Sequence, residues 1–111
     1  MVDKLAMLLN QFSTHKELIL NVSRILARIS SNYFVSESLR KLGKPFLKDL
    51  MGLLQNYDKN TAIAARVVYV LGNQTTNYET ARMFVGAKEH LDQGKTILTI
   101  LNNYLQCENT G

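Results

Sequence analysis

Proline, cysteine and tryptophan are nearly missing from this sequence, which holds one proline, one cysteine and no tryptophan in 111 residues. With Pro45 as the single proline, helices can run without interruption through most of the chain. The lone cysteine, Cys107, excludes an internal disulfide, and with only His15 and His90 beside it no spacing suits a structural zinc site. We therefore expect neither a metal nor a cofactor.

Long hydrophobic runs are missing as well. The longest apolar stretches, 62–65 and 67–72, are separated by Arg66, so no segment approaches the ~20 apolar residues that a membrane helix needs. The first four residues include an acidic and a basic side chain, and no small-residue cleavage site for secretion follows them. The pattern predicts an intracellular, cytoplasmic protein without a membrane partner.

The composition fits one folded domain and assigns no activity. Hydrophobic residues make up 46% of the chain and charged residues 20%, which is enough apolar material for one packed core. The net charge of +4 is a mild excess that permits acidic partners without indicating nucleic acid. No set of nucleophile, acid and base accompanies either histidine, so we expect a protein that is not an enzyme.

Hydrophobic periodicity dominates the pattern. From Leu18 to Ile29, and again from Ile63 to Leu71, apolar residues recur every three or four positions, as the buried faces of α-helices require. This spacing predicts an all-α fold with seven helices. In chain order, the helices are expected at residues 2–12, 15–30, 33–42, 45–56, 60–75, 78–90 and 95–106.

Local signals mark several helix ends. Thr14 with Glu17, and Thr76 with Glu79, fit capping boxes that would begin two of the helices. Residues 43–45 combine a glycine that tolerates a positive φ with a proline suited to a first helical turn. One helix is therefore expected to end at this turn and the next to begin.

The sequence also repeats itself. A shift of 45 residues without a gap places Asn32-Tyr33 on Asn77-Tyr78, and a shift of 47 places residues 53–57 on 100–104. Periods of ~40 to 47 residues with two or three helices per unit are typical of helical solenoids. The apolar and aromatic pairs brought together by the first shift are Leu9 with Leu54, Phe12 with Tyr57, Val22 with Val67, Ile25 with Val70 and Leu26 with Leu71.

Two segments, residues 21–29 and 66–74, resemble the third helix of an armadillo repeat. In that family, small and apolar residues precede a Leu-x-Asn ending, which residues 71–73 match and in which Arg28 replaces the asparagine. HEAT repeats are the close competitor, and three helices per unit favour the armadillo type. The resemblance covers nearly the whole chain.

The resemblance implies a right-handed helical solenoid of about two and a half armadillo (ARM/HEAT-like) repeats. Its expected units are a partial repeat 1–32, a repeat 33–77 and a partial repeat 78–111. Because both outer units are incomplete, we expect a fragment of a longer array whose apolar final helix promotes self-association in isolation. Within the family, the sequence is similar to a cilium- and flagellum-associated member, which implies a role in assembling or transporting axoneme components.

A polar stripe lies beside the apolar stripe on each armadillo-like helix. In the family, consecutive third helices line a concave groove, and Tyr69 stands where peptide-binding members carry an aromatic residue, four positions before Asn73. The asparagine amide would pair with the main chain of a bound segment, and arginines beside it favour carboxylates or phosphates. The resemblance thus predicts a scaffold that binds an extended or helical acidic segment of another protein along a groove lined by Asn21, Arg24, Arg28, Arg66, Tyr69 and Asn73.

Other interpretations of the stripe stay open at this point. The same residues fit the solvated face of two amphipathic helices, and the chain would then be a structural spacer that contacts adjacent repeats without a ligand groove of its own. The charge of +4 and the basic residues near Gly43, at positions 40, 41, 44 and 48, also allow a weak nucleic-acid-binding helical module. The aromatic residue within this basic cluster, Phe46, is better used in the core than for base stacking, so a solvated turn is favoured there.

Overall fold

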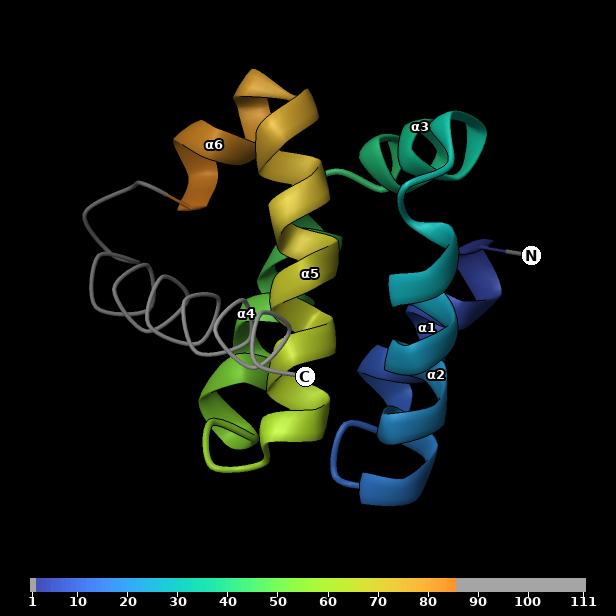
Figure 1. The fold of residues 1–111 in the computed structure, drawn as a ribbon, viewed down its shortest axis with the longest axis vertical. Helices are drawn as coiled ribbons and strands as arrows, with labels where there is room; N and C mark the ends of the chain where they lie inside the picture. The colour runs from blue at the N-terminus through green and yellow to red at the C-terminus, as the bar shows by residue number, and fades with distance from the viewer. Residues whose placement is uncertain (1, 86–111) are drawn as a thin grey trace, which may run out of the picture.

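The structure is a computed structural model that describes residues 2–85, and this part of the chain folds into helices without a strand (Figure 1). The all-α prediction is confirmed, and the predicted bounds agree with the observed ones to within two residues wherever both are described. The expected helix at 95–106 and the end of the helix expected at 78–90 lie outside the described residues. The helices are α1 (Val2–Gln11), α2 (Lys16–Ile29), α3 (Tyr33–Lys41), α4 (Lys44–Asn56), α5 (Thr61–Asn77) and α6 (Glu79–Val85).

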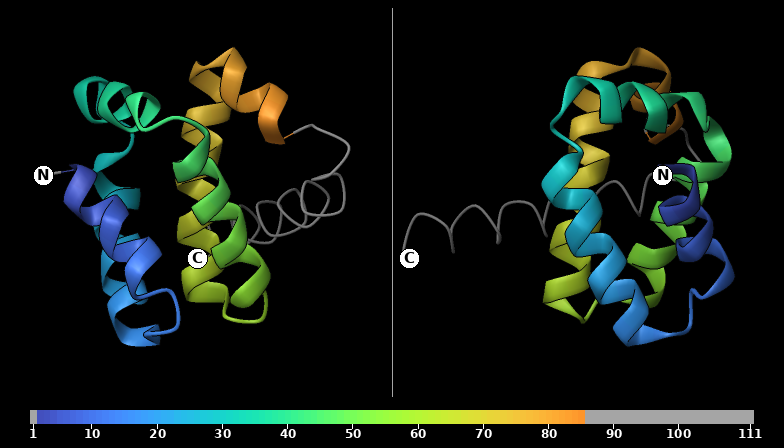
Figure 2. Two further views of the ribbon diagram at one scale, coloured as in Figure 1. Left: turned by 180° about the vertical axis from the view of Figure 1, so that it is seen from behind. Right: turned by 90° about the vertical axis from the view of Figure 1, so that its right-hand side faces the viewer.

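The helices form two triplets with the same order. We call α1, α2 and α3 the first triplet and α4, α5 and α6 the second triplet. Helix α2 begins at Lys16 and α5 begins 45 residues later at Thr61. Helices α2 and α5 lie side by side, α1 packs on α2 as α4 packs on α5, and α3 and α6 lie at the same end of the long helices (Figures 1 and 2). The repeated sequence pattern therefore corresponds to a repeated arrangement of helices.

The core lies where α2 and α5 meet and where α1 and α4 cover them. Leu26 of α2 is completely buried, and Leu71, the residue aligned with it by the 45-residue shift, is 1% exposed. Val22 and Val67, one turn earlier on the two helices, are buried as well. Since both members of these aligned pairs are core residues, the internal repeat reflects packing. None of the helices within residues 2–85 has the length and hydropathy needed to cross a bilayer.

Both predicted capping boxes are wrong. Helix α2 starts after His15, which makes no side-chain capping bond, so Thr14 lies before the cap position. Thr76 lies within the last turn of α5, because the backbone bonds of that helix continue until the Tyr78 N–H reaches the Gln74 carbonyl at 2.9 Å. The Thr-x-x-Glu pattern covers only four residues. At Thr76 the backbone hydrogen bonds of α5 continue through the pattern, so no helix begins there.

Asparagines cap two of the helices instead. The Oδ1 atom of Asn32 accepts hydrogen bonds from the first free amides of α3, at 2.9 Å and 3.2 Å. The Oδ1 atom of Asn60 accepts from the Ile63 amide of α5 at 3.2 Å. The short asparagine side chain reaches back to amides that have no partner within the first turn, which is why this residue type favours the position.

Two glycines of the α3–α4 region are expected to respond in opposite ways to alanine. Gly43 has φ 75° and ψ −158°, a region open essentially to glycine alone, and it precedes Pro45 in the first turn of α4 as predicted. Gly43→Ala should lower the free energy of unfolding by about 1 to 3 kcal/mol. Gly52 lies inside α4, where an added Cβ meets no atom within 4 Å, so Gly52→Ala should raise it by about 0.5 to 1 kcal/mol. Urea unfolding of the two variants tests the pair, and effects of the same sign would contradict this account of the turn.

Candidate functional site

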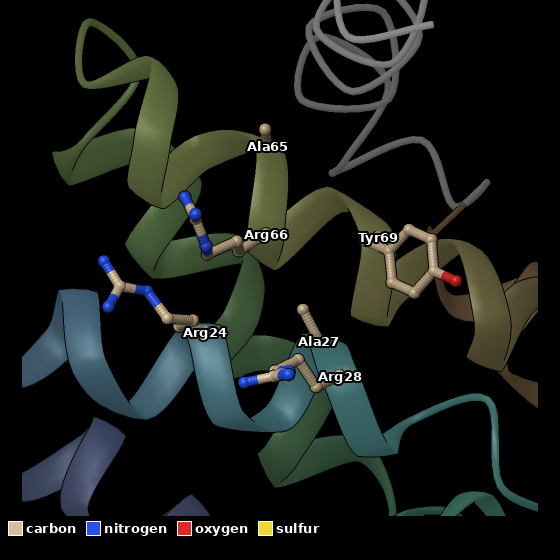
Figure 3. Close-up of a pocket in the computed structure, with 6 residues that line it drawn as sticks. All are labelled: Arg24, Ala27, Arg28, Ala65, Arg66 and Tyr69. Atoms are coloured by element: carbon tan, nitrogen blue, oxygen red, sulfur yellow. The ribbon is translucent and has the colours of Figure 1, made fainter. Parts of the chain in front are cut away.

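A shallow hollow of about 480 Å³ lies between α2 and α5 (Figure 3). We call it the α2–α5 hollow. It contains four of the six residues predicted from the sequence, because the polar stripes of the two neighbouring helices face the same side of the seam between them. The lining residues are Arg24, Ala27 and Arg28 from α2 and Ala65, Arg66 and Tyr69 from α5.

Small residues make room for the hollow and long ones surround it. Ala27 and Ala65 have side chains of a single methyl group, so the two helices leave space between them at this level. The side chains of Arg24 and Arg66 extend toward the same part of the hollow from opposite helices, and the Tyr69 ring lies farther along α5 (Figure 3). Sequence reasoning missed the two alanines, whose only signal is that each adjoins an arginine of the polar stripe.

The arginines keep most of their hydrogen-bonding capacity. Arg66 donates one bond from Nη1 to the Ala62 carbonyl at 2.7 Å, one turn earlier on the same helix. The side chains of Arg24 and Arg28 make no ion pair or hydrogen bond with another residue of the described part of the chain. A guanidinium carries five N–H donors, so this group of side chains offers many donors to a ligand.

The hollow is electropositive. Three of its six lining residues are arginines and none is acidic. Cations that converge without an anion repel one another, and a bound carboxylate or phosphate removes that repulsion while forming charge-assisted hydrogen bonds. Tyr69, 39% exposed, adds an aromatic face and a phenol at the end of the site. The arrangement suits an anionic side chain on a segment that lies over the seam.

The two predicted asparagines do not line the hollow. Asn21 is exposed on α2, outside the lining residues. Asn73 donates a hydrogen bond from Nδ2 to the Ser30 hydroxyl at 2.8 Å, across the seam between the triplets. This bond joins α5 to the end of α2 through the Asn73 Nδ2 atom, and the expected pairing of the amide with a bound main chain stays a prediction.

A row of polar contacts fixes the second triplet against the first. Gln74 is 2% exposed, and its Nε2 atom donates to the carbonyl and the hydroxyl oxygen of Ser36 at 3.2 Å and 3.3 Å. The Tyr57 hydroxyl donates to the Ser13 carbonyl at 2.7 Å. These bonds join α5 to α3 and the end of α4 to the loop between α1 and α2, and so hold the second triplet against the first. The sequence signal for Gln74 was a polar residue on an otherwise apolar stripe.

Arg40, a member of the predicted basic cluster, is already paired. Its Nε and Nη2 atoms donate to Glu37 Oε2 at 3.2 Å and 2.9 Å, and the guanidinium carbon lies 5.5 Å from the centre of the Tyr78 ring. The hydrogen bonds from Arg40 lower the pKa of Glu37. The Glu37–Arg40 ion pair is therefore intact at pH values above the ordinary pKa of a carboxyl group, and it is lost as the pH falls through the lowered pKa of Glu37. A nucleic-acid backbone would have to compete with Glu37 for this arginine.

No group of three or more His, Cys, Asp or Glu side chains within residues 2–85 lies close enough to hold a metal ion. In comparisons with known proteins, the chain matches no family model, no curated protein and no solved structure.

Proposed function

We propose that this chain is a non-catalytic interaction segment that binds an acidic segment of another protein in the α2–α5 hollow. The observation that carries the proposal is the convergence of Arg24, Arg28 and Arg66 from two helices on one hollow with no acidic lining residue. An extended or helical ligand segment lying over the seam would place a carboxylate or phosphate among the guanidiniums. An apolar or aromatic residue beside that anion would pack on Tyr69.

The proposal includes an architecture. We assign the chain to a right-handed solenoid of the armadillo type, with about two and a half repeats and seven helices. The repeated helix order and the parallel placement of α2 and α5 support this assignment. In such an array the α2–α5 hollow would belong to a continuous groove, and further units would extend it.

A matched pair of double variants tests the binding site. The probe is a short fluorescent peptide rich in glutamate, and its affinity is measured by anisotropy at fixed ionic strength. Arg24→Glu with Arg66→Glu should weaken binding by roughly 10- to 100-fold, because two donors are replaced by like charges facing the ligand. Lys41→Glu with Lys48→Glu changes the net charge equally but lies around the α3–α4 turn, and should weaken binding only a few-fold through long-range attraction.

The outcomes separate the competing functions. Equal losses in both double variants would show that only net charge matters, and would contradict a site in the hollow. Absence of binding to any acidic peptide at low salt would favour a structural spacer. Tighter binding to an oligonucleotide than to the peptide, with a steep salt dependence, would favour the nucleic-acid alternative.

The cellular setting follows from the resemblance to a cilium- and flagellum-associated armadillo protein. On that basis we extend the proposal to the assembly or transport of axoneme components, with the hollow holding an acidic segment of the cargo. Tagged protein along the axoneme of ciliated cells would agree with this setting, and exclusion from cilia would contradict it.

A further inference from the structure

Five large side chains of the first triplet are unusually exposed for apolar residues. Phe34 is 78% exposed, and a shift of 45 residues places it on Glu79, which is exposed as well. The other four have counterparts in different surroundings. Met7 is 51% exposed, Phe12 43%, Ile25 45% and Tyr33 69%. They come from three segments of the first triplet, two from α1 and its end, one from α2 and one from the start of α3. A shift of 45 residues places them on Gly52, Tyr57, Val70 and Tyr78, in the same order.

Those counterparts in the second triplet all lie on its side toward the first. The hydroxyl of Tyr78 donates to Glu37 Oε1 at 3.3 Å, and Tyr57 donates to the Ser13 carbonyl. Gly52 borders a second hollow together with residues of α1. Val70 is 1% exposed. It stands about one turn from Asn73 and Gln74, which bond to Ser30 and Ser36 of the first triplet.

The correspondence defines a face of the first triplet. Because the triplets are built alike, residues in these positions on the first triplet point away from the second. We call Met7, Phe12, Ile25 and Tyr33 the outer face; the side of the molecule formed by the first triplet is turned toward the viewer in Figure 2, right. Within residues 2–85, the outer face has no triplet before it to pack against.

We propose that the outer face binds another three-helix unit, one that presents the kind of surface the first triplet presents to the second. The contact between the two triplets serves as the template. Ile25 would be buried as Val70 is, and the Tyr33 hydroxyl would donate to an acceptor on the added unit, as that of Tyr78 does to Glu37. The outer face shares no residue with the α2–α5 hollow, where the acidic ligand is proposed to bind.

The test supplies such a unit in the correct register. Residues 1–45 are duplicated in front of the complete chain, so that the α1–α3 sequence precedes the natural first residue by one period. The added copy presents to the outer face the same surface that the natural first triplet presents to the second triplet. We expect one cooperative thermal transition, with a melting temperature raised by roughly 5 °C or more. The amides around the natural Ile25 should exchange more slowly with solvent than in the original chain.

Ile25→Asp supplies the control. In the original chain the change should leave the melting temperature nearly unaltered, because the side chain is half exposed. In the extended chain, at the natural copy, it should remove the gain. A separate transition for the added residues, or an unchanged melting temperature, would overturn the proposal. A large loss from Ile25→Asp in the original chain would also overturn it, because the face would then already be covered. Reversible dimerisation of the original chain that Ile25→Asp abolishes would reassign the face to self-association.

Discussion

Val70→Asp should lower the free energy of unfolding by about 3 to 5 kcal/mol, because it places a carboxylate without a partner in the contact between the triplets. Val70 is 1% exposed and lies on the side of α5 that carries the bonds from Asn73 and Gln74. A small domain has about 5 to 15 kcal/mol of stability in total, so much of it would be lost. Urea unfolding followed by circular dichroism measures the change.

The matched control is Ile25→Asp, at the equivalent position of the first triplet. Ile25 is 45% exposed, so its carboxylate stays hydrated and the free energy of unfolding should change by no more than about 0.5 kcal/mol. A large loss of stability at Val70 and a small one at Ile25 would confirm that Val70 is covered by the first triplet and that Ile25 is uncovered. Similar losses at both positions would contradict the assignment of Ile25 to an uncovered face.

Leu26→Ala should lower the free energy of unfolding by about 3 to 5 kcal/mol. Leu26 is a completely buried core residue of α2, and truncation removes three carbons and leaves a cavity. Rigid helices on both sides limit how far the cavity can collapse, which sets the cost near the upper part of the usual range.

The neighbouring residue provides the comparison for this core variant. Ile25→Ala, one position earlier on the same helix, should cost less than about 1 kcal/mol, since nearly half of its side chain already contacts water. Denaturant unfolding with an unchanged m-value would show that both variants alter stability without altering the native compactness. A small loss for Leu26→Ala would mean that the core around α2 is not packed as described.

The helices could be predicted from the sequence because each long one has a buried side. Spacings of three and four residues identify the faces that carry Leu26 and Leu71, and the 45-residue shift pairs them correctly. The helix starts at Thr14 and Thr76 were misjudged, because a capping motif is only a few residues long and several residue types satisfy the same free amides. Asn32 and Asn60 illustrate the competing choice.

The site could be predicted only in part. Four residues of the polar stripes reach the α2–α5 hollow because the repeat places their helices next to each other. The role of Asn73 could not be deduced, because it depends on Ser30, which is 43 positions away in the chain. The same holds for Gln74 and Ser36, whose contact depends on how α3 crosses the end of α5. Such tertiary bonds leave no periodic signal in a single sequence.

The most direct test of the α2–α5 hollow is a titration of isotope-labelled protein with the glutamate-rich peptide, followed residue by residue in NMR spectra. The largest shift changes are predicted at the backbone amides of Ala27, Arg28, Ala65 and Arg66 and at the ring of Tyr69, with saturation at a common affinity. Largest changes around the α3–α4 turn, or small changes spread evenly over the lysines and arginines, would contradict a binding site in the hollow.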